Sequence, residues 1–162
     1  MELKISILNL LKKNCTYTYQ EIAKMLNTTE EEVKKTIKEL EESGAIIKYC
    51  ALVNEEVVNK KQIAAIIEVK ITPESGKGFD AIAEKICQFK EVTNCMLVSG
   101  SFDLIVTVEG TDAKEIALFV AEKLATIKGI LSTNTHFLLR KYKIEGEKVF
   151  KKNNSKRLAI TP

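Results

Sequence analysis

The sequence predicts an α+β fold in which three helices are followed by a ferredoxin-like βαββαβ series. Apolar residues recur at helical spacing up to Gly44 and alternate at strand spacing from residue 62 onwards, and two further helical runs interrupt the strands. These patterns divide the chain into a helical domain, a linker, a mixed domain and a basic tail that we expect to be disordered. The boundaries are 1–53, 54–61, 62–147 and 148–162, respectively.

The helical domain contains three predicted helices. The third is expected to begin at Thr29, which has the spacing of a capping box with Glu32, and to end at Gly44, which tolerates a left-handed backbone. Apolar residues three, four or seven positions apart indicate the inward stripes of the three helices: Leu3, Ile7, Leu10 and Leu11, then Tyr19, Ile22, Ala23 and Leu26, then Val33, Ile37 and Leu40.

Residues 45–53 are β-branched and apolar, which predicts a strand, or a wing followed by a strand. Three helices with a short turn before a capped third helix are typical of a helix-turn-helix. The third helix would then present its outer face to the major groove of DNA, which an α-helix fits. The expected fold of residues 1–53 is therefore a winged helix-turn-helix.

The mixed domain is expected to leave one face of its sheet uncovered. Both helices of a split βαβ motif pack on the same face, so the other face is open. The first strand places Ala64 and Ile66 on that face, ahead of Glu68 and Lys70. A second copy of the same sheet would cover these apolar residues, which predicts a two-fold homodimer. The predicted strands are 62–71, 92–99, 103–109 and 131–139, and the predicted helices are 79–89 and 112–128.

Composition excludes several classes of protein. Of the 162 residues 45% are hydrophobic and 29% charged, and no apolar run approaches the length needed to span a bilayer. Residues 1–61 contain ten lysines and ten glutamates, and the excess positive charge lies in the tail. The four cysteines form no CxxC pair and one histidine accompanies them, so we expect buried free thiols in a reducing cytoplasm and no metal site or cofactor.

Two segments of the chain resemble the Lrp/AsnC transcriptional regulators. Glu21-Ile22-Ala23, residues 29–40 and the run Glu41-Glu42-Ser43-Gly44-Ala45-Ile46 are similar to the helix-turn-helix of that family. The turn Gly100-Ser101-Phe102-Asp103-Leu104 is similar to the family's glycine-x-aromatic-aspartate loop. The likeness spans about residues 1–145. It departs at Thr36, where the family commonly has an arginine.

The resemblance implies a transcriptional regulator that binds duplex DNA, forms dimers that assemble into an octamer, and responds to an amino acid or a similar small molecule. In the family the effector binds between dimers, at the loop that matches Gly100, Phe102 and Asp103 here. Each of these three residues also has a structural alternative. Gly100 would be a turn glycine with positive φ, Phe102 a core residue, and Asp103 a cap on a backbone amide.

The candidate DNA contacts lie at the start, on the outer face and beyond the end of the third helix: Thr28, Thr29, Lys34, Lys35, Lys38 and Lys48. Residues 1–61 contain no arginine, so they offer no guanidinium group to form paired hydrogen bonds with guanine. We therefore expect DNA binding to be dominated by phosphate contacts. Tyr49 is a further possible wing contact. The alternative is a solvated face, on which Glu31 pairs with Lys35 and Lys38 pairs with Glu42.

A DNA-binding regulator is therefore the leading hypothesis, and two other functions compete with it. An effector-binding oligomeric module with weak or lost DNA binding is suggested by the acidic start of the third helix. An enzyme is disfavoured, because the only histidine is His136, the only arginines are Arg140 and Arg157, and no nucleophile–base pairing or phosphate loop is present. We expect His136 to be a surface or interface residue.

Overall fold

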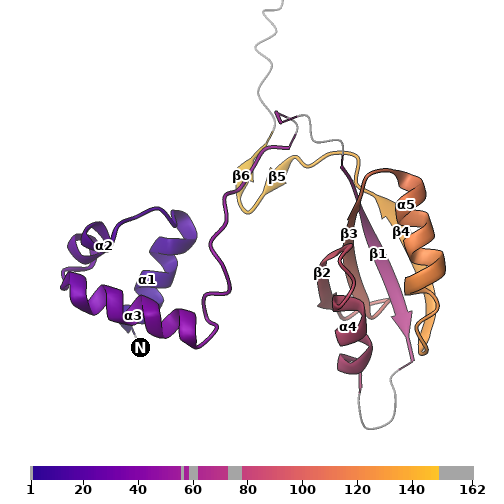
Figure 1. Ribbon diagram of the computed structural model, residues 1–162, viewed down its shortest axis with the longest axis horizontal. Helices are drawn as coiled ribbons and strands as arrows, with labels where there is room; N and C mark the ends of the chain where they lie inside the picture. The colour runs from indigo at the N-terminus through magenta and orange to yellow at the C-terminus, as the bar shows by residue number, and fades with distance from the viewer. Residues whose placement is uncertain (1, 56, 59–61, 73–77, 150–162) are drawn as a thin grey trace, which may run out of the picture. The chain divides into compact units, whose positions relative to one another are not determined.

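The computed structural model describes residues 2–55, 57–58, 62–72 and 78–149 (Figure 1). The chain divides into two compact units, Met1–Val53 and Asn54–Pro162. Within the described residues, no helix combines the length and the apolar character that crossing a bilayer requires.

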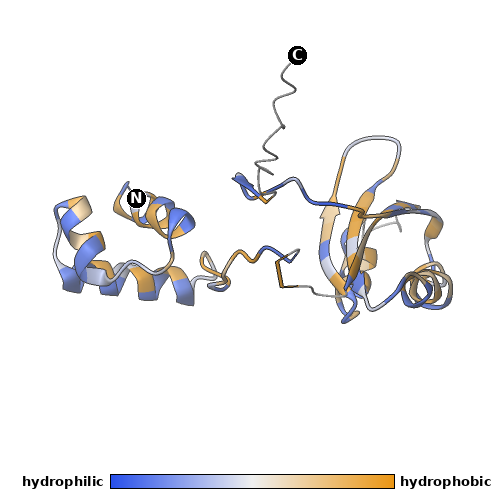
Figure 2. Cartoon of the chain, turned by 90° about the horizontal axis from the view of Figure 1, so that it is seen from above, coloured by the Kyte–Doolittle hydropathy of each residue, from blue (hydrophilic) through white to orange (hydrophobic). Residues whose placement is uncertain are grey.

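The first unit is a bundle of three helices, as the sequence predicts. They are α1 (Glu2–Lys13), α2 (Tyr19–Leu26) and α3 (Glu30–Glu42). Each carries apolar and hydrophilic residues on different sides, which Figure 2 shows as alternating orange and blue. The apolar sides meet in one buried cluster. Its members are Ile7, Ile22, Ala23, Val33, Ile37 and Leu40.

The two caps in this unit differ from expectation. The full capping box lies at α2, where the Glu21 amide donates to Thr18 Oγ1 at 3.2 Å and the Thr18 amide donates to Glu21 Oε2 at 2.8 Å. At α3 only half of the predicted box forms: the Glu32 amide donates to Thr29 Oγ1 at 3.2 Å, while the Glu32 carboxylate accepts from the Thr28 hydroxyl. Gly44 follows α3 with φ +73°, which confirms the predicted stop.

The strand predicted for residues 45–53 is not formed, so that prediction was wrong. These residues have irregular backbone, and Ile47 is 91% exposed. A strand needs a neighbour to pair with its backbone groups, and the described part of the first unit contains only helices and loops. The β-branched residues of this segment favour an extended backbone, but they do not provide a neighbouring strand to pair with.

The second unit has the predicted βαββαβ order and contains a four-stranded antiparallel sheet of strand order β2-β3-β1-β4. Its elements are β1 (Ile63–Ile71), α4 (Asp80–Cys87), β2 (Val92–Leu97), β3 (Leu104–Gly110), α5 (Ala113–Phe119) with the π-helical turn η1 (Val120–Leu124), and β4 (Ile130–Phe137). Gly129 has φ +100° and ends the second helical segment before β4, as expected.

The core of this unit lies between the sheet and its two helices. Alternate residues of β1 and β3 are buried, so they point to one face of the sheet. They belong to one cluster with residues of α4, α5 and η1, which places both helices on that face (Figure 1). The cluster is Ala65, Ile67, Val69, Ile71, Ile82, Ile86, Leu104, Val106, Val108, Ile116, Phe119 and Leu124.

A short hairpin that the sequence analysis did not predict follows β4. Its strands are β5 (Lys143–Ile144) and β6 (Glu147–Lys148), joined by Glu145 and Gly146. Both turn residues have positive φ, 46° and 90°, as a two-residue hairpin turn of type I′ requires. The structure therefore places Lys148, the first residue of the predicted tail, in a strand. Residues 150–162 of that tail lie outside the described residues.

Candidate functional site

The outer face of α3 carries the three candidate lysines. Lys34, Lys35 and Lys38 are all exposed. Lys38 Nζ lies 3.6 Å from Glu42 Oε1, which confirms one of the two ion pairs considered above. The other, between Glu31 and Lys35, is not among the ion pairs of the described residues. Two of the three ammonium groups are thus available to an anionic partner.

The remaining candidate contacts lie at the two ends of α3. Thr29 is exposed and caps the helix, and Thr28 is half-buried with its hydroxyl on the Glu32 carboxylate. Lys48 is exposed in the irregular segment beyond the helix. Thr36 faces inward instead: it is 7% exposed and its hydroxyl donates to the Glu32 carbonyl at 2.8 Å. Thr36 therefore cannot contact DNA in place of the arginine that the family commonly has at this position.

The loop between β2 and β3 is fixed to the end of β1. The Asp103 amide donates to the Val69 carbonyl at 3.0 Å, and Asp103 Oδ2 accepts from the Ile71 amide at 2.8 Å. The Val98 amide donates to the Asp103 carbonyl at 2.9 Å. Asp103 thus caps a backbone amide, as the structural alternative requires, and holds Gly100 and Phe102 in place at the tip of the loop.

Gly100 has no structural reason within its own chain to be a glycine. Its φ is outside the left-handed region, so the turn explanation for it was wrong. A Cβ built there would meet no atom within 4 Å. Phe102 is half-buried and does not belong to the core cluster of the described residues. The backbone at Gly100 is therefore accessible to a ligand, and the half-buried ring of Phe102 lies two residues further along the loop.

The sheet face opposite the helices carries both apolar and polar residues. Strand register places Met96 beside Ile105, and Ile66 beside His136, on this face. Met96 is 50% exposed, and Ile66 and Ile105 are half-buried. His136 Nε2 lies 3.2 Å from Glu68 Oε1, which confirms a surface position for the only histidine. Within the described part of the second unit, no helix covers these residues.

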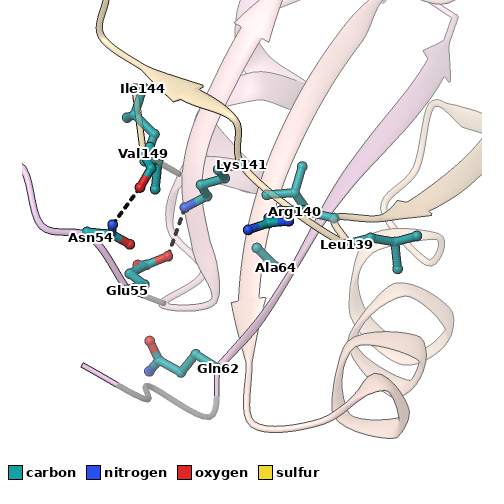
Figure 3. A pocket seen from close by; sticks show the side chains of 10 residues that line it. Asn54, Glu55, Gln62, Ala64, Leu139, Arg140, Lys141, Ile144 and Val149 are labelled. Atoms are coloured by element: carbon teal, nitrogen blue, oxygen red, sulfur yellow. Dashed lines mark hydrogen bonds and ion pairs between the residues drawn. The ribbon is translucent and has the colours of Figure 1, made fainter. Parts of the chain in front are cut away.

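A small pocket of about 230 Å³ lies where the chain enters and leaves the sheet (Figure 3). Lys141 Nζ lies 3.0 Å from Glu55 Oε2, and Asn54 Nδ2 donates to the Val149 carbonyl at 2.8 Å. These contacts bind the segment before β1 to the segment after β4. Two of the charged groups of the pocket, Lys141 and Glu55, are thus already paired with each other, and Arg140 also lines it.

The cysteines are reduced, but they are not buried as expected. Cys15, Cys50 and Cys87 are exposed, and Cys95 is half-buried. Burial, and after it the neighbouring Cys87 thiol, raises the pKa of Cys95 to about 11, so Cys95 stays protonated at neutral pH. Among the described residues no three His, Cys, Asp or Glu side chains are grouped as a metal site.

Two family models match the chain. Residues 2–47 match a winged helix-turn-helix DNA-binding domain, and residues 64–147 match the Lrp/AsnC ligand binding domain. The second match contains the loop of Gly100 and Asp103.

Relatives match almost the full chain. The HTH-type transcriptional regulator YugG of Bacillus subtilis is 38% identical over 99% of this chain and 98% of its own. The transcriptional regulator NMB0573 of Neisseria meningitidis, solved as a complex with L-Met, is 25% identical with a TM-score of 0.68 and covers 89% of this chain and 92% of its own. Escherichia coli AsnC, at 21% identity, has the same fold, with a TM-score of 0.66 over 89% of this chain and 95% of its own. The chain therefore belongs to the Lrp/AsnC family of HTH-type transcriptional regulators.

Proposed function

We propose that this regulator acts in the cytoplasm by binding duplex DNA as a two-fold dimer, and that an amino acid bound at the loop of Gly100 modulates it. The observation that carries the proposal is α3, a capped helix held by a packed bundle with Lys34, Lys35 and Lys38 pointing outward. A helix of this kind fits the major groove, and its ammonium groups would neutralise phosphates.

The lysines favour binding through phosphates over readout of bases. An ammonium group is a single point charge, whereas the planar guanidinium of arginine binds guanine through two parallel hydrogen bonds. The hydroxyls of Thr28 and Thr29 are engaged within the cap region of α3. We therefore expect strong dependence on salt and modest discrimination between DNA sequences.

We predict that the purified protein retards duplex DNA and that added salt weakens the complex steeply. Three lysines on each of two protomers would release about five counterions, so a fourfold rise in salt should weaken binding on the order of 10³-fold. Gel retardation and fluorescence anisotropy at several salt concentrations measure both the affinity and the slope. A protein that fails to retard DNA even at low salt would refute the proposal.

The alternative function is an effector-binding module that has lost productive DNA binding. Glu30, Glu31 and Glu32 in the first turn of α3 favour it, because their negative charges would repel phosphates at the end of the helix that enters a groove. The same retardation experiment separates the two functions: the module would bind amino acids and leave DNA unretarded.

The open sheet face supports the dimer. Two such faces brought together would shield Ile66, Ile105 and Met96 from water. The arrangement is self-complementary, as a two-fold interface requires, and would pair two α3 helices on one duplex. Further assembly of dimers into an octamer follows from the family resemblance and belongs to the same proposal.

The amino-acid site is proposed at the tip of the β2–β3 loop. The relative from Neisseria meningitidis is complexed with L-Met, which makes an α-amino acid the first ligand to test. Open backbone at Gly100 would let a ligand or a neighbouring subunit approach closely. The carboxylate of Asp103 already accepts a hydrogen bond from the Ile71 amide. Its role would therefore be to fix the conformation of the loop.

We predict that Gly100→Val abolishes the response to amino acids and leaves the fold intact. The new side chain meets nothing in its own chain, so the stability should change by less than about 0.5 kcal/mol. Thermal denaturation of the protein with each of the common amino acids tests both statements, with Ser99→Val as the matched control. Equal ligand-induced stabilisation in Gly100→Val and the wild type would move the site elsewhere.

A further inference from the structure

The first unit contains a cavity that the proposed function does not use. Its volume is about 650 Å³, within the range of small-molecule sites. It lies between the turn that joins α1 to α2, the first residues of α2 and one side of α3. Tyr49, from the segment after α3, also lines it, and the cavity is open to solvent.

The lining includes aromatic rings and carboxylates. Three of the four tyrosines of the chain contribute to it, Tyr17 and Tyr19 from around the start of α2 and Tyr49 from the segment after α3. Glu30 and Glu41 reach the cavity from the two ends of α3. Although the chain has 25 lysines and arginines, the described lining contains none. Neither carboxylate belongs to an ion pair among the described residues.

Tyr49 links the cavity to the carboxylate of Glu41. Its hydroxyl donates to Glu41 Oε1 at 2.9 Å. Burial, that bond and the charge of Glu41 raise the pKa of Tyr49 to about 12, with smaller contributions from Tyr19 and Cys15. Burial opposes a charge of either sign, so the carboxylate of Glu41 is the group here that would attract a cation.

We propose that this cavity binds a small organic cation, a primary amine or a guanidine. Its ammonium or guanidinium group would lie against the tyrosine rings and beside the carboxylate of Glu41, and Glu30 would add negative charge at the other end of α3. The negative face of an aromatic ring attracts a cation within about 6 Å, and a carboxylate adds a charge-assisted hydrogen bond. Ile37, in the floor of the cavity, would contact the hydrocarbon part of the ligand. Phosphates and free carboxylates are excluded by the charge of the lining.

Agmatine and putrescine are the probes, because neither contains the α-carboxylate of an amino acid. Isothermal titration calorimetry of the full-length protein should detect binding of at least one of them, and none of the neutral isostere 1,4-butanediol. Equal affinity for the diamine and the diol, or no amine binding, would overturn the proposal. Moderate salt in the buffer suppresses diffuse attraction to the acidic surface.

Two variants test the lining. Glu41→Gln should weaken amine binding about tenfold, because it removes the charge and keeps the shape of the acceptor for Tyr49. Tyr19→Leu should weaken it about threefold through loss of the ring face. Both changes are at exposed positions, so we expect both variants to fold.

Two controls complete the experiment. Glu42→Gln removes the same charge one residue further along α3, where the side chain pairs with Lys38 and does not line the cavity. An equal loss in Glu42→Gln would show attraction by acidic surface in general and overturn the proposal. Gly100→Val must leave amine binding unchanged, which separates this site from the amino-acid site of the proposed function.

Discussion

Ile66→Glu is expected to convert the proposed dimer into monomers of 18.2 kDa. Ile66 lies in β1, a central strand, with Thr107 and His136 beside it on the open face. In a face-to-face dimer the new carboxylate would be removed from water without a partner. Leaving a buried charge unpaired costs about 3–5 kcal/mol, which weakens association on the order of 10²-fold to 10⁴-fold. Sedimentation equilibrium measures the mass directly.

Leu118→Glu is the matched control for this prediction. Leu118 is 43% exposed on α5, which packs on the other face of the sheet, so the same new charge there should leave the dimer intact. If Ile66→Glu remains dimeric while the wild type is a dimer, the open face is not the interface. A monomeric wild type would contradict the dimer itself.

Loss of the dimer should also weaken the binding of DNA. A second recognition helix on the same molecule binds at a high effective concentration, so the monomer should bind DNA on the order of 10²-fold more weakly than the dimer. Fluorescence anisotropy with the same duplex measures this loss. The folded state of Ile66→Glu can be checked by circular dichroism, because the substituted side chain lies outside the buried core.

Several of the elements that the sequence predicts correctly have periodic burial. Alternation at residues 65, 67, 69 and 71 places β1, and the stripe of Val33, Ile37 and Leu40 places α3. The strand expected over 45–53 fails because composition can favour extended backbone without supplying a neighbouring strand. The hairpin of β5 and β6 was missed because strands of two residues have no period to detect.

The candidate sites were only partly predictable. Asp103 and the lysines of α3 are local features, so sequence motifs find them. The tyrosine-lined cavity depends on Tyr17, Tyr19 and Tyr49 meeting in space, and their spacing in the chain carries no sign of it. The structural explanation of Asp103 is also a long-range one, since its carboxylate accepts from an amide 32 residues earlier.

The second large effect is expected when Lys34, Lys35 and Lys38 are all replaced by alanine. Losing six phosphate contacts per dimer should weaken DNA binding on the order of 10⁵-fold at about 0.1 M salt and reduce the salt slope by about five. Alanine has a higher helix propensity than lysine, and the three side chains are exposed, so α3 should keep its structure. Anisotropy titrations across a series of salt concentrations measure both quantities.

A triple replacement of the same charge tests whether the position of the lysines matters. Lys85, Lys114 and Lys128 are exposed in the second unit, and changing them to alanine removes the same net charge. We expect this control to leave the salt slope nearly unchanged. If both triple variants lower the slope equally, DNA is attracted by the overall charge of the protein and α3 has no special part in binding.

The three lysines should not contribute equally. Lys38 lies 3.6 Å from Glu42 and would have to leave that carboxylate to contact a phosphate, whereas Lys34 and Lys35 form no ion pair among the described residues. An exposed ion pair of this kind contributes less than about 1 kcal/mol, so Lys38 can still leave Glu42 for a phosphate. Its net contribution to DNA binding is then smaller than that of Lys34 or Lys35. The double variant of Lys34 and Lys35 should therefore lose most of the affinity, and Lys38→Ala alone should lose least. The opposite order would mean that the C-terminal part of α3, and not its first two turns, contacts the duplex.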